Sequence, residues 1–168
     1  MITQALVREL FNYDPETGIL SNRKYRGGRS GKAGSPVGSP HPAGYLSAMV
    51  EGKNYLIHRL IWLYVHGVFP PEDIDHHDGD RANNRIGNLR SASRTENNQN
   101  MAVRSDNTSG VTGVWRVGGR WRARVTVDGQ HFHAGYFGTF EEATAAYLAA
   151  KAKHHEFQPV PRQLTSKL

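Results

Sequence analysis

Aspartate and asparagine are concentrated in one stretch near the middle of the chain, residues 75–100. Their side chains favour turns, caps and oxygen-ligand sites, and they add nothing to an apolar core. The stretch is therefore too polar to be explained as packing, and any core has to form from the segments around it. A chain of 168 residues is long enough for one compact domain or two small ones. We expect two modules, each only marginally stable alone.

The residues ahead of this stretch predict two helices and a hairpin. A short amphipathic helix opens the chain and ends at turn-forming residues 14–18. Residues 44–57 have the pattern of a β-hairpin with its turn at 51–54. Residues 58–66 have the apolar content of a buried helix, which Gly67 would stop. The apolar face of the first helix consists of Ile2, Leu6, Val7, Leu10 and Phe11.

A different pattern begins after Gly110. Two dipeptides, Gly118-Gly119 and Asp128-Gly129, suit two-residue hairpin turns that need positive φ. Thr139 and Glu142 have the spacing of a capping box at the start of a helix. The second module is therefore predicted to be a three-stranded antiparallel sheet covered by one helix, which makes the chain α+β. The expected strands are 111–117, 120–127 and 130–137, and the helix would end near residues 151–155.

The first of these turns fixes the faces of the sheet. If Gly118-Gly119 is a two-residue turn, Val117 lies opposite Arg120 and Trp115 opposite Arg122. Trp115, Arg122 and Arg124 then share one face, and Trp121, Ala123 and Val125 share the other. The second set suits packing under the helix. In this register Arg116 falls on the helix side and would reach the rim.

The overall charge restricts the class of partner. Lys and Arg total 21 against 15 for Asp and Glu, a formal charge of +6, which favours a nucleic acid. The sequence has no cysteine, so disulfides, thiol nucleophiles and thiolate zinc sites are excluded, and a reducing cytoplasm is compatible. The longest apolar run, residues 60–65, is too short to span a bilayer, and the first residues do not resemble a signal peptide. We expect a soluble protein that is not exported and has no membrane partner.

Residues 21–44 are rich in Gly, Ser and Pro and carry cations but no acidic residue. This composition favours a mobile basic arm. Charge alone leaves two interpretations open, a solvated loop and an arm that follows DNA phosphates. The cations are Arg23, Lys24, Arg26, Arg29 and Lys32.

The Asp- and Asn-rich stretch contains an ordered set of short motifs. Its first part predicts a strand that leads into an Asp-Gly turn, and Ser93 and Glu96 have capping-box spacing at the start of a helix. In this order the motifs resemble the HNH nucleases, more specifically their phage and intron-encoded branch. They are Ile74-Asp75-His76-His77-Asp78-Gly79-Asp80, Asn83-Asn84, Gly87-Asn88-Leu89-Arg90 and Ser93-Arg94-Thr95-Glu96-Asn97-Asn98.

The resemblance implies a ββα fold around one divalent ion. Asp75 and Asn97 would be the protein ligands of Mg²⁺ or Mn²⁺, and His76 would be the general base. Asn88 would hydrogen-bond the connecting loop and keep His76 oriented. Phosphodiester hydrolysis needs an attacking hydroxide and a cation that stabilises charge on the phosphate, and an imidazole is available as a base at neutral pH.

Other interpretations of single motifs are weaker. The aspartates lack the spacing and the closing Glu of a calcium loop, and the His-Glu-x-x-His helix of a zinc hydrolase is missing. His77 could compete with His76, but strand alternation points the two to opposite faces. His58 is interpreted as a core or helix-capping histidine. Asn83, Asn84 and Asn98, taken singly, are interpreted as loop or helix-surface residues.

The C-terminal part, from Ser109 to about Phe157, resembles the AP2 DNA-binding domain. The likeness implies that the sheet lies in the major groove of double-stranded DNA. Plant AP2 domains carry arginines on the first strand where this chain has Thr112, Trp115 and Val117, so their base preference does not transfer. The motifs of the likeness are Ser109-Gly110-Val111-Thr112-Gly113-Val114, Trp121-Arg122-Ala123-Arg124-Val125, Gly138-Thr139-Phe140 and Glu141-Glu142-Ala143.

Together the two resemblances imply a metal-dependent DNA endonuclease, encoded by a phage or a homing element and acting in the host cytoplasm. We expect a monomer or weak dimer that nicks one strand at a time. The alternatives are a DNA-binding regulator with a degenerate nuclease scaffold and a structure-specific nuclease. The expected parts are a nuclease domain at 1–101 with the arm at 21–44, a linker at 102–109, a DNA-binding domain at 110–157 and a tail at 158–168. The predicted DNA contacts are Arg23, Lys24, Arg26, Arg29, Trp115, Arg116, Arg120, Arg122 and Arg124.

Overall fold

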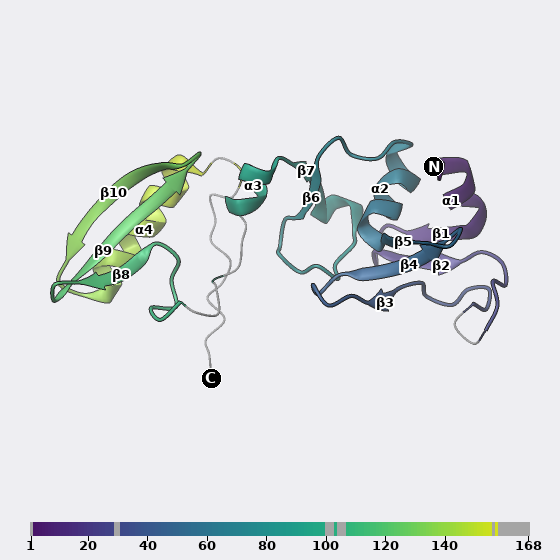
Figure 1. The fold of residues 1–168 in the computed structure, drawn as a ribbon, viewed down its shortest axis with the longest axis horizontal. Helices are drawn as coiled ribbons and strands as arrows, with labels where there is room; N and C mark the ends of the chain where they lie inside the picture. The colour runs from purple at the N-terminus through teal and green to yellow at the C-terminus, as the bar shows by residue number, and fades with distance from the viewer. Residues whose placement is uncertain (1, 29–30, 100–102, 104–106, 156, 158–168) are drawn as a thin grey trace. The chain divides into compact units, whose positions relative to one another are not determined.

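The computed structural model describes residues 2–28, 31–99, 103, 107–155 and 157. The chain is α+β, with several small antiparallel sheets (Figure 1). It divides into two compact units, Met1–Ala92 and Ser93–Leu168, and each is described by itself.

The first unit opens with the predicted helix and continues into a hairpin that the sequence did not reveal. Helix α1 (Gln4–Leu10) begins at Thr3, whose Oγ1 accepts from the Leu6 amide. Strand β1 (Phe11–Asp14) follows directly and pairs with β2 (Ile19–Asn22). The turn residues at 14–18 therefore join two strands. Phe11 ends the helix and starts the strand, and its side chain is fully buried.

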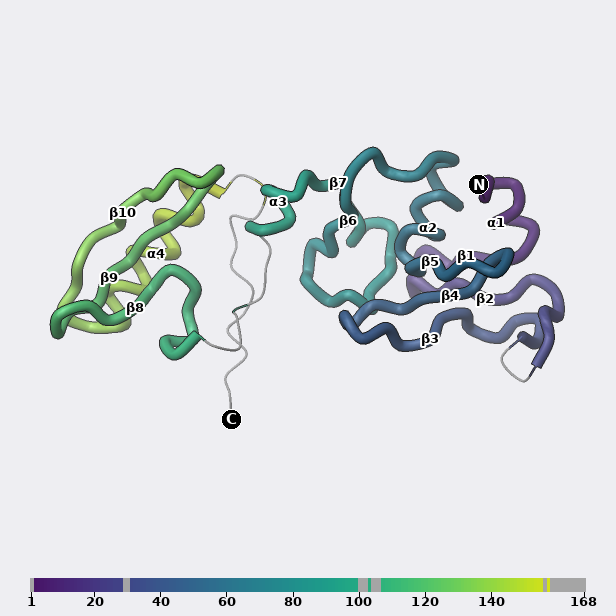
Figure 2. Tube along the Cα trace, viewed as in Figure 1, coloured from purple at the N-terminus to yellow at the C-terminus, as the bar shows by residue number. Residues whose placement is uncertain are grey.

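The predicted hairpin and buried helix are confirmed. Strands β4 (Leu46–Val50) and β5 (Lys53–Leu56) pair through a turn in which Glu51 and Gly52 have positive φ, and β3 (Ser39–Pro40) lies on the other side of β4. Helix α2 (Ile57–His66) continues directly from β5 (Figure 2) and ends at Gly67, which has φ 82°. The core of this unit is built around Val7, Phe11, Leu20, Val50, Ile57, Leu60 and Ile61.

The basic segment, whose composition favoured a mobile arm, contacts the rest of the first unit at several points. Ser21 pairs with Pro36, and β3 joins the sheet. The Arg23 Nη1 donates to the Arg8 carbonyl at 2.9 Å, and Lys24 forms a 3.4 Å ion pair with Glu9. Two cations of the segment thus bind a carbonyl and a carboxylate of the same unit, and backbone hydrogen bonds such as that from the Val37 amide to the Leu20 carbonyl add to these contacts.

Arg26 is engaged in the same way. Its Nη2 donates to the Met49 carbonyl at 3.0 Å, and its guanidinium lies 4.7 Å from the centre of the Phe11 ring. Arg29 lies outside the described residues.

Two further strands carry the Asp- and Asn-rich stretch. Strand β6 (Asp73–His76) pairs antiparallel with β7 (Leu89–Ala92), and the 3₁₀ helix η1 (Ile86–Asn88) leads into β7. Ile74, Leu89 and Ala92 are buried. This pairing brings residues of the first and the third motifs in the stretch to opposite positions on neighbouring strands.

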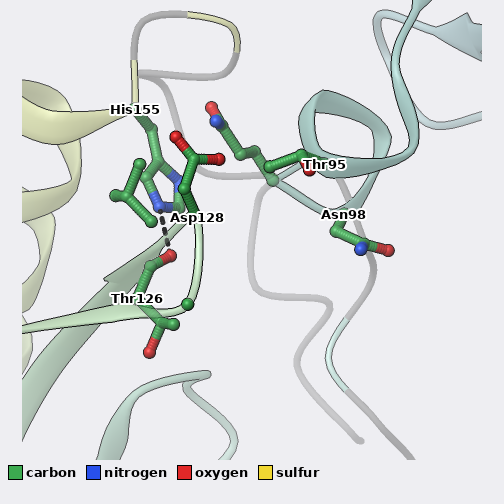
Figure 3. A pocket seen from close by; sticks show the side chains of 8 residues that line it. Thr95, Asn98, Thr126, Asp128 and His155 are labelled. Atoms are coloured by element: carbon green, nitrogen blue, oxygen red, sulfur yellow. Dashed lines mark hydrogen bonds between the residues drawn. The ribbon is translucent and has the colours of Figure 1, made fainter.

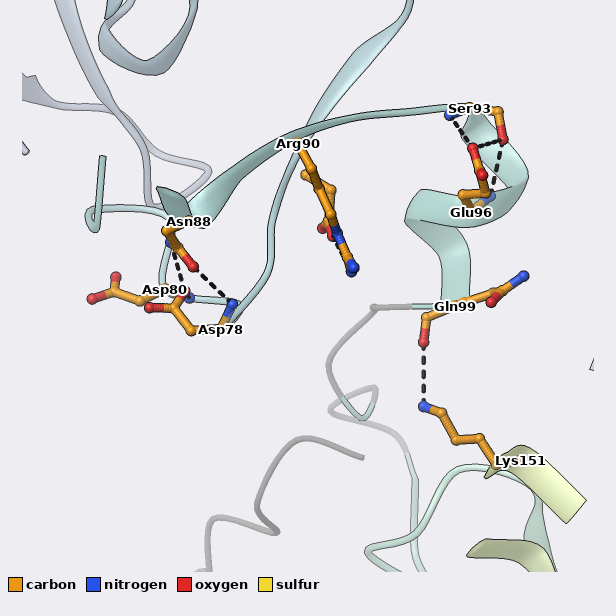
Figure 4. A network of polar contacts seen from close by, with 9 residues as sticks. Asp78, Asp80, Asn88, Arg90, Ser93, Glu96, Gln99 and Lys151 are labelled. Carbon is orange, nitrogen blue, oxygen red and sulfur yellow. Dashed lines mark hydrogen bonds and ion pairs between the residues drawn. The ribbon is translucent and has the colours of Figure 1, made fainter. Parts of the chain in front are cut away.

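The second unit begins with helix α3 (Arg94–Gln99). The predicted capping box is confirmed, because the Ser93 Oγ accepts from the Glu96 amide and Glu96 Oε2 accepts from the Ser93 amide. A 3.3 Å hydrogen bond from Lys151 Nζ to the Gln99 carbonyl links this helix to the following elements (Figure 4).

The remainder of the unit is the predicted sheet and helix. Strands β8 (Val114–Val117), β9 (Arg120–Val127) and β10 (Gln130–Phe137) form an antiparallel sheet with β9 in the centre. Helix α4 (Phe140–His154) packs against it and starts with the predicted Thr139–Glu142 capping box. The core consists of Val111, Val114, Ala123, Val125, Ala143 and Tyr147.

The boundary between the units lies between Ala92 and Ser93, ahead of the linker predicted at 102–109. Helix α3 groups with the second unit, to which the Gln99–Lys151 hydrogen bond ties it. Residues 102 and 104–106 of the predicted linker, and the predicted tail 158–168, lie outside the described residues. Within the described part of the chain, no helix is both long and apolar enough to cross a bilayer.

Candidate active site

A buried ion pair lies on the strand pair β6–β7. Asp75 and Arg90 are register partners, and the Asp75 side chain is only 4% exposed. Arg90 donates to Asp75 Oδ2 from Nε at 2.9 Å and from Nη2 at 2.8 Å, and Figure 4 shows the Arg90 side chain. A buried carboxylate is costly unless a cation and hydrogen bonds compensate it. The two hydrogen bonds from Arg90 therefore hold the Asp75 side chain in a defined orientation.

His76 follows at the end of β6 and is also buried. Its Nε2 lies 3.2 Å from the Oδ1 of Asn84, whose side chain is buried as well. The Asn84 Nδ2 donates to the Ala82 carbonyl at 3.1 Å. Sequence reasoning placed Asn84 among the loop residues, and the structure places it against the expected general base.

Aromatic rings cover the His76 ring. The His58 ring meets it edge-on at 5.1 Å between centroids, and the Tyr45 ring lies 5.8 Å from it and 5.0 Å from His58. The guanidinium of Arg81 lies 4.9 Å from the centre of the Tyr45 ring and donates to the Ala43 carbonyl at 2.6 Å. Arg81 thus links the loop after β6 to the segment before β4, next to the two histidines.

Both histidines are held neutral by burial. Burial, with smaller contributions from the nearby His76 and Arg59, lowers the pKa of His58 to about 3. Burial also lowers the pKa of His76, while the hydrogen bond with Asn84 and the carboxylates of Asp75, Asp78 and Asp80 act in the opposite direction. His58 was interpreted as a core histidine; it is buried, and it also contacts the expected base.

Asn88 organises the loop between β6 and β7. Its Oδ1 accepts from the Asp78 amide at 3.0 Å, and its Nδ2 donates to Asp78 Oδ1 and to the Asn83 carbonyl, each at 2.9 Å (Figure 4). Its backbone carbonyl accepts from the His77 amide at 2.9 Å. Burial raises the pKa of Asp78, but hydrogen bonds from Asn83 and Asn88 outweigh this effect and lower it overall. The expected contact between Asn88 and the connecting loop is present.

His77 differs from its neighbour in environment. Its side chain is exposed, whereas that of His76 is buried. The difference does not come from strand alternation, because β6 ends at His76, where three consecutive residues are buried, and His77 lies in the turn that follows. Only His76 makes ring contacts with Tyr45 and His58.

The donor chemistry at the expected ligands suits a hard divalent cation. Asp75 offers a carboxylate, and Asn97, half-buried on α3 in the second unit, offers an amide oxygen. Mg²⁺ and Mn²⁺ prefer such oxygen donors and keep several water ligands. Among residues 2–28, 31–99, 103, 107–155 and 157, no group of three or more His, Asp or Glu side chains is placed to hold a metal. Asp75 belongs to the first unit and Asn97 to the second, and their binding of one cation stays a prediction.

The sheet of the second unit carries a cationic and aromatic face. The register predicted from Gly118-Gly119 is confirmed, with Trp115 opposite Arg122 and Val117 opposite Arg120. The guanidinium groups of Arg122 and Arg124 lie 5.3 and 5.1 Å from the Trp115 ring, and Arg122 also lies 5.6 Å from the ring of Tyr136.

The other side of this sheet packs under α4. Ala123 and Val125 are almost completely buried there, as the face assignment predicted. Arg116, opposite Trp121, and Arg120, at the turn, are both exposed. The sheet therefore presents its cations on one face and at the rim.

A separate cavity of about 240 Å³ lies in the second unit (Figure 3). His155 lines it, and its Nε2 lies 3.2 Å from the Thr126 carbonyl. Burial lowers the pKa of His155. The other lining residues are Thr95, Asn98, Gln99, Thr126, Val127, Asp128 and Gly129, none of which is an expected catalytic or metal residue.

Comparisons with known proteins define the class of this site. The sequence model of the HNH endonuclease family matches residues 55–99, from β5 to the end of α3. The match includes the buried pair of histidines and the loop that Asn88 organises, so this part of the chain is an HNH endonuclease domain.

A phage protein is similar over a longer range. Protein 3.8 of Escherichia phage T7 is 32% identical over 103 residues, which cover 60% of this chain and 85% of that protein. The chain belongs to the same family as Protein 3.8. No solved structure matches the chain significantly.

Proposed function

We propose that the protein is a phage-encoded, metal-dependent endonuclease that hydrolyses phosphodiester bonds in double-stranded DNA. The observation that carries the proposal is the environment of His76 within the HNH domain: a buried imidazole that is hydrogen-bonded to Asn84 and follows the Asp75–Arg90 ion pair on β6. A neutral imidazole in a fixed orientation is a competent general base near neutral pH.

In this proposal Asp75 and Asn97 hold one Mg²⁺ or Mn²⁺. The bound cation supplies charge stabilisation on the scissile phosphate and on the leaving 3′ oxygen. His76 takes the proton from the attacking water, and the cleaved strand carries 5′-phosphate and 3′-hydroxyl ends. Asn88 contributes by fixing the loop that follows His76, through its bonds to Asp78 and the His77 amide.

The second unit is proposed to position the duplex. An AP2-like sheet would contact DNA through its exposed face, where Trp115, Arg122 and Arg124 lie together. Guanidinium groups suit phosphates and guanine edges, and an aromatic ring adds apolar contact. The proposed contacts at the rim are Arg116 and Arg120.

The basic segment makes a smaller contribution in this account. Arg23, Lys24 and Arg26 already bind groups of their own unit, so only their remaining N–H groups can donate to phosphates. Arg29 stays a sequence-based candidate. The family relationship to a phage protein supports action in the cytoplasm of the infected host, and the homing role stays a hypothesis.

A plasmid cleavage assay tests the proposed function. The wild-type protein should convert supercoiled DNA to the nicked form with Mg²⁺ or Mn²⁺, and EDTA should abolish the conversion. Asp75→Ala should be inactive even at high metal concentration. Cleavage that survives EDTA would contradict the metal dependence, and wild-type protein that binds DNA without cutting it would favour the regulator that retains only a nuclease scaffold.

A further inference from the structure

We propose that Asn84 is a positioning residue that sets which nitrogen of His76 carries the proton, so that Nε2 is protonated and Nδ1 is the basic nitrogen. The assignment of the tautomer stands on the geometry alone, and its catalytic meaning rests on the proposed nuclease function. Asn84 and Asn88 then have different roles, because Asn88 is hydrogen-bonded to the loop whereas Asn84 is hydrogen-bonded to the imidazole.

The orientation of the Asn84 amide decides the direction of the hydrogen bond. Its Nδ2 donates to the Ala82 carbonyl at 3.1 Å, so its Oδ1 is the atom that faces His76 Nε2 at 3.2 Å. A carboxamide oxygen only accepts, so Nε2 must donate. In a neutral imidazole only one nitrogen carries a proton, and Nδ1 is then the nitrogen with the lone pair.

The backbone of Asn84 is itself anchored by the β1–β2 hairpin. Its carbonyl accepts from the Tyr13 hydroxyl at 3.0 Å, and the same hydroxyl accepts from the Ile86 amide at 2.8 Å. Gly18 approaches so closely that a Cβ there would lie 2.7 Å from the Asn84 carbonyl carbon. This approach and the bonds of Tyr13 let the short hairpin hold in place the residue that orients the base.

The rings of His58 and Tyr45 oppose rotation of the imidazole away from Asn84. Both lie within 6 Å of the His76 ring, centroid to centroid, and His58 is buried. If the ring turned over, a carbon would replace Nε2 opposite Asn84 Oδ1, and a buried acceptor would lose its donor. Leaving a buried polar group unsatisfied costs about 1–3 kcal/mol, so a single ring orientation and a single tautomer are favoured.

The tautomer can be read directly by ¹⁵N–¹H correlation spectra of the imidazole rings in the metal-free protein, at a pH where histidine is neutral, with His76→Gln identifying the signal. The wild-type protein should show one His76 tautomer, with a protonated Nε2 and an unprotonated Nδ1. Asn84→Ala should shift both nitrogens towards the average of two tautomers. Asn84→Asp, which keeps an acceptor, should restore the wild-type pattern, and the control Asn88→Ala should leave the tautomer unchanged.

Two results would overturn the inference: a protonated Nδ1 in the wild-type protein, or identical His76 signals in the wild-type protein and Asn84→Ala. If Asn84→Ala does not fold, Asn84→Asp and the wild-type spectrum still decide. The spectra need no cleavage, so a wild-type protein with the expected tautomer but no activity would refute the nuclease and not the tautomer. In an active enzyme, Asn84→Ala should lower kcat by roughly 10–100-fold with little change in KM, and Asn84→Asp should recover part of it.

Discussion

Replacing Arg90 by alanine should leave the Asp75 carboxylate buried without its guanidinium partner. Asp75 is 4% exposed, and Arg90 approaches its Oδ2 with two nitrogens, at 2.8 and 2.9 Å. Removal of one member of a buried pair costs about 3–5 kcal/mol. Because the Arg90 side chain is 24% exposed, water can reach part of the vacated space, and we expect a loss of about 3 kcal/mol in the unfolding free energy of the first unit.

The chain offers a matched control for this experiment. Lys24 and Glu9 form an exposed ion pair at 3.4 Å in the same unit, and Lys24→Ala should cost less than about 1 kcal/mol. Urea unfolding read by hydrogen exchange and mass spectrometry reports on peptides of each unit separately, which avoids treating the whole chain as one transition. Equal losses in the two variants, or a loss confined to the second unit, would refute the argument that Arg90 compensates Asp75.

Three further predictions concern acid stability, DNA binding and the second core. Burial lowers the pKa of His58 in the folded protein to about 3, so as the pH falls below about 6.5 the unfolded chain takes up a proton at His58 before the folded protein does. The unfolding free energy, measured against pH, should therefore fall more steeply in the wild type than in His58→Phe, by about 1.4 kcal/mol per pH unit. Parallel slopes in the two proteins would contradict this. Arg122→Ala should weaken DNA binding and reduce the slope of log K against log salt by about one, whereas Lys153→Ala on α4 should change neither, as fluorescence anisotropy can measure. Gly113 and Gly110 both have φ of +80°, but a Cβ at Gly113 would meet backbone and an aromatic ring, whereas a Cβ at Gly110 would meet open space. Gly113→Ala should therefore destabilise the second unit by roughly 3 kcal/mol or more, and Gly110→Ala by about 1–2 kcal/mol. Equal losses of stability in thermal unfolding would contradict the role of packing at Gly113.

The features of the fold that depend on local chemistry were predictable from the sequence. The Gly118-Gly119 and Asp128-Gly129 turns set the strand ends and the register of the residues next to them, because two-residue turns with positive φ define the first pairs of a hairpin. The shift of the β9–β10 register between His133 and Gly135 was not predicted. The capping boxes at Ser93 and Thr139 predicted the starts of two helices for the same reason.

The features that depend on long-range contacts were not predictable. The β1–β2 hairpin was missed because Phe11 continues the apolar face of α1 and each strand has only four residues. The basic segment was expected to be mobile because charge carries no information about which carbonyls lie nearby, and Arg26 reaches Met49 across the fold.

The same distinction applies to the candidate site. Motif order was enough to select Asp75, His76 and Asn88, and the strand pairing and loop contacts are consistent with their proposed roles. No periodicity marks Asn84 or Tyr45, because their contacts with His76 arise from the path of irregular loops. The adjacent Asn83-Asn84 was the single sequence signal that could have drawn attention to the first of them.

The central claim, that His76 is the general base of a DNA-cleaving HNH centre, is tested most directly by single-turnover cleavage rates of His76→Ala and His77→Ala. The two residues are adjacent, so the variants match in position and chemistry, but only His76 is buried against Asn84 and His58. The account predicts that His76→Ala lowers the rate of strand cleavage by at least about 100-fold with DNA binding unchanged, and that His77→Ala changes it by much less. Full activity in His76→Ala, or loss of activity in His77→Ala alone, would contradict it.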